Sequence, residues 1–121
     1  QLMLTLQAMI ERVLEGEAGQ PFLRDKADAV LLVEACANEG ASGLLLFPEN
    51  LTKSFFDLSS GEAGEILQKL RNYALRLAVV RAPAAAPLSP RFRELMLEEN
   101  RDRHFHLFEN RDEAETWLFE R

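Results

Sequence analysis

Short apolar runs of two kinds alternate along the chain, and they predict a succession of strands and helices. Leu2 to Leu6 and Met9 to Leu14 alternate weakly, which indicates two opening strands paired as a hairpin before the turn-forming stretch Gly16 to Pro21. A helix over Gln7 to Val13 fits the same residues. The run Gly43 to Phe47 is apolar throughout, which is typical of a central strand covered by helices on both faces.

Apolar residues at helical spacing predict four helices, and two further apolar runs predict strands between them. The order ββαβαβαβα implies right-handed crossovers in a mostly parallel sheet. We therefore expect one α/β domain over residues 1–121, with a mixed sheet of about five strands and about four helices. The helices are expected at Arg24 to Glu39, Ser59 to Tyr73, Ser89 to Asn100 and Asn110 to Leu118, and the further strands at Leu75 to Val80 and His104 to Phe108.

Capping signals mark the ends of several predicted helices. Asp25 lies where a negative charge suits the first turn of the first helix, and Gly40 follows its last turn. Ser89 before Pro90 is typical of an N-cap followed by proline at the first helical position, and Asn110 suits the N-cap of the last helix.

The net charge of the chain and the length of its apolar runs argue against two classes of partner. A chain of 121 residues with a net charge of −6 lacks the basic field that general nucleic-acid binders need. Its longest apolar runs fall far short of the ~20 residues that span a bilayer, and no basic-then-apolar leader precedes the first element. We therefore expect no nucleic-acid partner and no membrane partner.

Cys36 is the only cysteine, so no internal disulfide and no thiolate metal cage can form. Its apolar, helix-patterned surroundings favour a buried structural thiol over a nucleophile. A reducing cytoplasm is the location that we expect.

The charge is uneven along the chain. From Arg71 to Arg103, seven arginines stand against four acidic residues, whereas both flanks are acidic. This stretch is either a solvated arginine-rich face or a docking patch for an acidic partner.

The motifs of the commoner enzymes do not occur in this sequence. Gly61 and Gly64 supply only the second half of a dinucleotide-binding fingerprint, and there is no phosphate-binding loop, serine-hydrolase elbow or zinc-protease motif. His104 and His106 share one face of a strand, a spacing that can ligate a metal, but no third ligand is identifiable. We therefore predict no enzymatic activity, no metal and no cofactor.

The best candidate site is the turn Asp57 to Gly61, just before the second predicted helix. Ser59 and Ser60 stand where the unpaired N–H groups of a helix start face outward. Ser59 with Glu62 is by itself a capping box, which explains one serine without any function. The alternative is phosphorylation of either serine, which would add nearly two negative charges to an already acidic turn.

Phe55 and Phe56 form an aromatic pair in the loop before that turn. They either plug the end of the sheet or line a pocket there, and large aromatic side chains usually bury themselves. Together with Glu62 and Glu65, they are the residues that we assign to a pocket at the carboxyl ends of the strands, where open α/β sheets place ligands.

The segment Ser54 to Lys69 has a Phe-Phe-Asp-Leu start, an Ala-Gly-Glu-Ile helix opening and a Gln-Lys pair, and it resembles the bacterial family called domain of unknown function 4180. An Asn-Tyr pair, here Asn72 and Tyr73, followed by the strand Leu75 to Val80 extends the resemblance. More loosely, the match runs from about residue 10 to residue 119. Because that family has no assigned function, the resemblance implies a fold and a lineage more than an activity.

More distantly, the same segment looks like the STAS motif of anti-sigma-factor antagonists, Phe-Ile-Asp-Ser-Ser-Gly-Leu-Gly, whose serine is phosphorylated. This likeness implies a single STAS-like domain. Here Leu58 stands between the aspartate and the serines, and Glu62-Ala63 replaces the apolar residue before the second glycine, so the phosphoacceptor is Ser59, Ser60 or neither. After the fourth strand, Arg81 to Pro83 replaces the Gly-Asp-type turn expected from the family.

These patterns together predict a non-enzymatic regulatory or protein-interaction domain, which binds a protein partner around Asp57 to Gly61 and is switched by serine phosphorylation. The alternative is a small-ligand-binding protein or modest enzyme. A deep cleft between Phe55, Asp57 and the loop Ala82 to Leu88, which we expect to be extended and mobile, would favour that alternative. A homodimer would cover the sheet edge that a short opening hairpin leaves open.

Overall fold

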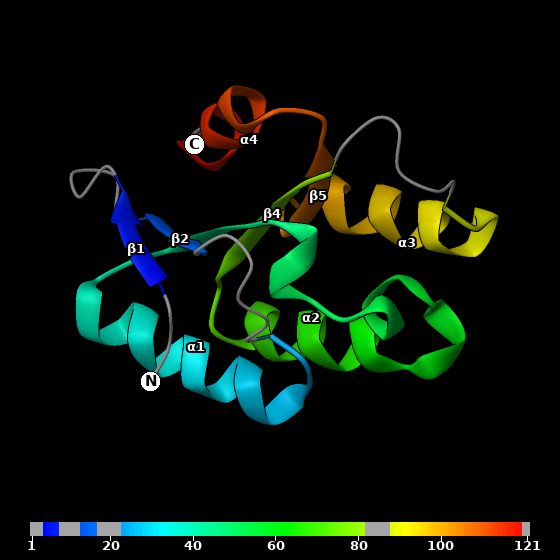
Figure 1. Cartoon of the computed structure of the whole chain (residues 1–121), viewed down its shortest axis with the longest axis horizontal. Coiled ribbons are helices and arrows are strands. Elements are labelled where there is room, and N and C mark those ends of the chain that lie inside the picture. The colour runs from blue at the N-terminus through cyan, green and yellow to red at the C-terminus, as the bar shows by residue number, and fades with distance from the viewer. Residues whose placement is uncertain (1–3, 8–12, 17–22, 82–87, 120–121) are drawn as a thin grey trace.

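The computed structural model describes residues 4–7, 13–16, 23–81 and 88–119 (Figure 1). Three short 3-10 turns join β3 to α2, namely η1 (Pro48–Asn50), η2 (Lys53–Phe56) and η3 (Leu58–Ser60). The strands are β1 (Leu4–Gln7), β2 (Val13–Gly16), β3 (Gly43–Leu46), β4 (Arg76–Val80) and β5 (Phe105–Phe108), and the helices are α1 (Lys26–Glu39), α2 (Glu62–Asn72), α3 (Pro90–Arg101) and α4 (Arg111–Phe119).

The strands form one five-stranded mixed sheet in the order β1-β2-β3-β4-β5. β1 pairs antiparallel with β2, with Leu4 opposite Gly16, and each of the other neighbouring pairs is parallel. The predicted α/β class, the mostly parallel sheet and the element order ββαβαβαβα are confirmed. The antiparallel pairing of the two opening strands is confirmed as well.

The opening strands lie later in the sequence than the apolar pattern indicates. β1 includes Gln7, and β2 extends to Gly16, which the sequence assigns to the turn. A Cβ atom at position 16 would lie 2.4 Å from Oδ1 of Asn50, so glycine is needed here for packing of the strand against the loop after β3. Residues 1–3, 8–12 and 17–22, which complete the predicted strands and turn, lie outside the described residues.

The two faces of the sheet are covered differently. Right-handed crossovers between strands in sequential order bring α1, α2 and α3 to the same face, where Leu44, Leu77 and Phe105 join the larger core. On the opposite face, Trp117 and Leu118 of α4 pack in a smaller core. Figure 1 shows α1 and α2 on one side of the sheet and α4 on the other. β3 is buried at all four positions because it contacts both layers, as its apolar run predicts.

Most of the predicted helix caps are present. Asp25 is the N-cap of α1 and not a first-turn residue, and its Oδ1 accepts the N–H of Asp28 at 3.0 Å. Gly40 ends α1 in the left-handed conformation, with a φ of 70°. Ser89 and Asn110 each accept a backbone N–H three residues further on, at 3.1 and 2.9 Å respectively.

Cys36 is buried in α1, as the sequence predicts. Burial raises the pKa of its thiol to about 12, so the thiol stays protonated at neutral pH. Within the described ranges no helix is long and apolar enough to cross a membrane.

The arginine-rich stretch from Arg71 to Arg103 does not form one solvated face. Arg71 of α2 pairs with the buried carboxylate of Glu99 on α3. Arg76 of β4 donates to backbone carbonyls of α4. These two arginines therefore stabilise contacts between elements, whereas the arginines of α3 and Arg103 are exposed and remain for the predicted docking patch.

Candidate functional site

The loop between β3 and α2 is tied to the segment that leads into α1. Asn50 is fully buried, and its Oδ1 accepts the N–H of Phe47 at 2.8 Å. Its carbonyl accepts the N–H of Leu23 at 2.9 Å, and Leu23 forms a parallel bridge with Leu51. The loop therefore starts from a fixed point at the carboxyl end of the sheet.

Phe55 anchors the middle of this loop. Its side chain is 0% exposed, and its ring lies edge-on to those of Phe56, Phe92 and Phe105, with centroids 5.3, 6.1 and 5.8 Å away. Phe56 is half-buried, and the guanidinium carbon of Arg81 lies 5.3 Å from its ring centroid. The plug interpretation is confirmed for Phe55, which has no exposed surface to offer a ligand.

The two serines of the candidate turn are both exposed, but they bond differently. Asp57 Oδ1 accepts the N–H of Ser59 at 3.1 Å and the hydroxyl of Ser59 at 2.6 Å. The hydroxyl of Ser60 donates to the carbonyl of Ser54 at 2.7 Å and accepts the N–H of Glu62 at 3.1 Å. Ser60 thus links η2 to the start of α2, whereas Ser59 bonds within the turn.

The predicted capping box of Ser59 and Glu62 is wrong. Residues Leu58–Ser60 form a 3-10 turn of their own, and α2 begins at Glu62 with Gly61 as its N-cap. Gly61 has a φ of 78°, a conformation that side chains disfavour. A Cβ at this position would meet nothing within 4 Å, so the backbone conformation alone accounts for the glycine.

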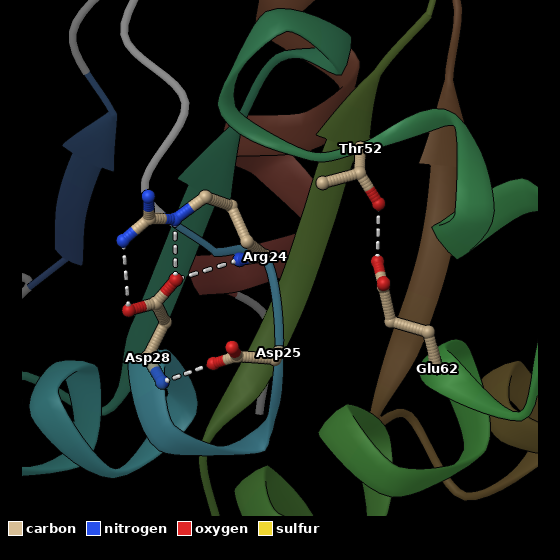
Figure 2. A network of polar contacts seen from close by, with 5 residues as sticks. All are labelled: Arg24, Asp25, Asp28, Thr52 and Glu62. Carbon is tan, nitrogen blue, oxygen red and sulfur yellow. Dashed lines mark hydrogen bonds and ion pairs between the residues drawn. The ribbon is translucent and has the colours of Figure 1, made fainter.

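The two carboxylates assigned to a pocket lie in different surroundings. Glu62 is half-buried and accepts the hydroxyl of Thr52 at 2.5 Å, as Figure 2 shows. Glu65 is exposed and lies with Lys26 and Lys69 beside a hollow of about 180 Å³ between α1 and α2. The structure therefore does not bring these carboxylates and the two phenylalanines into one cavity.

A second polar cluster fixes the start of α1. Arg24 donates to Asp28 Oδ2 from its Nε at 2.8 Å and from its backbone N–H at 3.0 Å (Figure 2). Burial alone would raise the pKa of Asp28, but the hydrogen bonds and the charge of Arg24 together lower it. Because the polar groups of Arg24, Asp25 and Asp28 form hydrogen bonds with one another, the cluster has a structural role.

Asn50 and Thr52 hold the loop in place, and neither was predicted from the sequence. An asparagine shortly after Pro48 suits a turn, and that signal could have identified Asn50. Nothing in the local sequence pairs Thr52 with Glu62, because the two residues are ten positions apart.

The two histidines do not assemble a metal site in the part of the chain that the structure describes, where no group of three or more candidate ligands occurs. His106 lies on the face of β5 that α4 partly covers, and burial lowers its pKa. The Nδ1 atoms of both His104 and His106 are buried without a hydrogen-bond partner among the described residues.

A groove of about 570 Å³ lies between β5 and α4, which we call the β5–α4 groove. His106 and Phe108 line it from the strand, and Glu109, Asp112 and Glu113 line it from the connection and the first turn of α4. It lies at the carboxyl end of β5. The groove could not be predicted from the sequence, because the position of α4 over the sheet depends on tertiary contacts.

Comparison with known proteins identifies the family of this chain. The chain matches no curated protein and no solved structure at a significant level. The family model described as Domain of unknown function (DUF4180) matches residues 9–118, which is most of the chain and includes the loop, the turn and the groove. The protein is therefore a member of the DUF4180 family.

Proposed function

We propose that this protein is a non-enzymatic interaction domain, and that phosphorylation of Ser59 switches its contact surface at Asp57 to Gly61. The observation that carries the proposal is the exposed hydrogen bond of 2.6 Å between the Ser59 hydroxyl and the Asp57 carboxylate, just before α2. Ser59 is favoured over Ser60 because the Ser60 hydroxyl bonds both Ser54 and the start of α2.

A phosphate on Ser59 would change this turn by simple electrostatics. The esterified oxygen can no longer donate to Asp57, and the phosphate adds close to two negative charges beside a carboxylate. Repulsion would displace Asp57 from the N–H of Ser59 as well, so η3 would lose both hydrogen bonds that the Asp57 carboxylate accepts. A partner that contacts residues 57–61 would therefore meet a different surface in each state.

The arrangement around Ser59 suits a switch better than a catalytic nucleophile. A nucleophilic serine is normally paired with a base such as histidine, which accepts its proton. The hydroxyl of Ser59 instead bonds a carboxylate in its own turn. We therefore propose binding, and not catalysis, as the activity of this surface.

We extend the proposal to a STAS-like fold in a bacterial, cytoplasmic protein. The element order ββαβαβαβα and a serine-bearing turn before the second helix are the features that support the STAS likeness. A single buried thiol supports a reducing compartment.

The small-ligand alternative has less support. Its cleft requires Phe55 as a wall, and this side chain has no exposed surface. Residues 82–87, to which this alternative assigns most of the opposite wall, lie outside the described residues.

Affinity purification of tagged variants from the native host, with quantitative mass spectrometry, tests the proposal. We expect a stoichiometric partner that Ser59→Ala retains and Ser59→Asp loses. Ser42→Asp is the matched control, because Ser42 is also exposed but precedes β3 at the opposite end of the sheet. Equal recovery with Ser59→Asp, equal loss with Ser42→Asp, or no partner at all would contradict the proposal.

A further inference from the structure

We propose that the β5–α4 groove binds a short, extended, basic segment of a protein partner. The groove is lined from β5 and α4, on the face of the sheet opposite α2, and none of its lining residues belongs to the Asp57 to Gly61 turn. This second surface therefore goes beyond the proposed function and does not depend on Ser59.

The groove lies beside the strand after which the helices change from one face of the sheet to the other. The helix after β4 packs on the face that carries the larger core, whereas the helix after β5 packs on the opposite face. Open α/β sheets place ligands at the carboxyl ends of their strands. The groove occupies that end of β5, beside the helix that packs on the opposite face.

The charge of the groove is negative. Glu109, Asp112 and Glu113 are exposed along it, and none of its lining residues is lysine or arginine. Burial lowers the pKa of His106, so this side chain adds no compensating charge at neutral pH. The nearby Arg111 bonds Glu15 at 2.6 Å. A basic ligand is therefore complementary to the groove.

Aromatic rings form part of the lining. The half-buried ring of Phe108 lies 5.6 Å from that of Trp117 and 5.0 Å from that of His106. A lysine or arginine side chain above Phe108 would gain a cation–π contact while its charge faces the carboxylates. Arg76 already covers Trp117, with its guanidinium carbon 4.2 Å from the ring centroid, which leaves Phe108 as the ring for a ligand.

The outer edge of β5, beside the groove, has backbone N–H and C=O groups that a ligand could bond. The carbonyls of His104 and Phe108 accept N–H groups of Leu77 and Arg81, at 2.8 and 2.7 Å, and therefore face β4. In a parallel ladder the intervening residues face the other way, so Leu107 turns its N–H and C=O groups to the outer edge, and the N–H of Glu109 follows the same direction. The side chain of Leu107 packs on the larger core, so its backbone is what it can offer to the groove.

An extended segment fits this combination better than a compact ligand. One strand residue beside Leu107 could pair with the edge, while its neighbours place side chains over Phe108 and the acidic wall. A second copy of this chain is a poor occupant. The described strand at the other edge, β1, carries no basic residue, and neither does β5 apart from its histidine.

Titration of the isotope-labelled protein with a blocked peptide of alternating arginine and valine tests the proposal. We expect salt-sensitive binding, with the largest NMR shifts at the backbone amides of Leu107 and Glu109. The variant Asp112→Asn with Glu113→Gln should weaken binding about tenfold, since it removes two exposed charge pairs. Glu94→Gln with Glu98→Gln is the matched control, because it removes the same charge from the exposed face of α3 and should leave the affinity unchanged.

Several outcomes would overturn this inference. One is the absence of binding, and another is equal binding of a peptide with glutamate in place of arginine. Equal weakening by the α3 control would indicate attraction by net charge alone. Shifts of the same amides on raising the protein concentration without peptide would show that a second copy occupies the edge. Ser59→Asp should not change the affinity, so a failure here is separate from a failure of the phosphorylation switch.

Discussion

Ser59 and Ser60 are neighbours with the same side chain, yet their hydroxyls have different hydrogen-bond partners and different structural roles. The hydroxyl of Ser60 connects two loop segments to the first turn of α2, so its loss would disturb the framework. The hydroxyl of Ser59 bonds one carboxylate at the surface, so a modification there changes the shape of the turn and leaves the core intact. This difference is the residue-level basis of the proposed switch.

Gly61→Ala should lower the free energy of unfolding by about 1 kcal/mol, because an alanine in the left-handed conformation is strained. No clash contributes, since a Cβ there would have no neighbour within 4 Å. Gly64→Ala is the matched control within α2 and should raise stability by about 0.5 kcal/mol, since glycine weakens a helix interior. Urea denaturation measures both changes, and effects of the same sign would contradict the assigned start of α2.

Cys36 should not react with Ellman's reagent in the folded protein at neutral pH. The thiol is 1% exposed, and burial raises its pKa to about 12, so the reactive thiolate is scarce. Complete reaction is expected in denaturant. Rapid labelling of the native protein would show that α1 opens readily or that the thiol is not buried.

At the scale of single residues, the sequence supports predictions wherever the chemistry is local. Asn110 and Ser89 cap their helices as predicted, because a cap depends on a backbone N–H three residues away. The capping box at Ser59 failed because a 3-10 turn and a left-handed glycine delay the helix. Thr52 was not predicted, because its bond to Glu62 depends on the path of the loop.

α4 is the element that contacts distant parts of the chain. Arg111 in its first turn bonds Glu15 of β2, and Arg76 of β4 donates to the carbonyls of Trp117 and Leu118 in its last turn, at 2.6 and 2.9 Å. These contacts join residues 96, 42 and 41 positions apart. The spacing of apolar residues predicted the helix α4. Which face of the sheet α4 covers depends on these long-range contacts, which the periodicity of the sequence does not reveal.

Arg76→Lys should cost about 2 kcal/mol of stability, because lysine keeps the charge but loses the planar fork that bonds two carbonyls at once. Trp117 is the only tryptophan, so its fluorescence should shift to the red as α4 loosens. Arg93→Lys on the exposed face of α3 is the control, and it should change neither stability nor fluorescence. Wild-type behaviour of Arg76→Lys would show that the guanidinium contacts of Arg76 do not hold α4 in place.

The whole molecule presents two separate surfaces on opposite faces of one sheet. The serine turn belongs to the layer of α1, α2 and α3, whereas the β5–α4 groove lies in the layer of α4. The fold class could be predicted from the sequence because strands and helices alternate with clear periods. The groove could not, because it exists only where α4 crosses the sheet.

The match to the DUF4180 family covers residues 9–118, which include the loop after β3 and the serine turn. The proposed switch requires one residue of that turn to be a phosphoacceptor. Locating the phosphate in the sequence tests this requirement, whereas an effect on binding alone does not.

The most direct measurement is mass spectrometry of the tryptic peptide Ser54 to Lys69 from protein isolated from its native host, with fragmentation that separates the serines within the peptide. We predict a phosphorylated fraction with the phosphate on Ser59, and a lower phosphate content in the partner-bound pool than in the free pool. A phosphate on Ser60, or a peptide that is unmodified under every growth condition sampled, would contradict the proposed switch at Ser59.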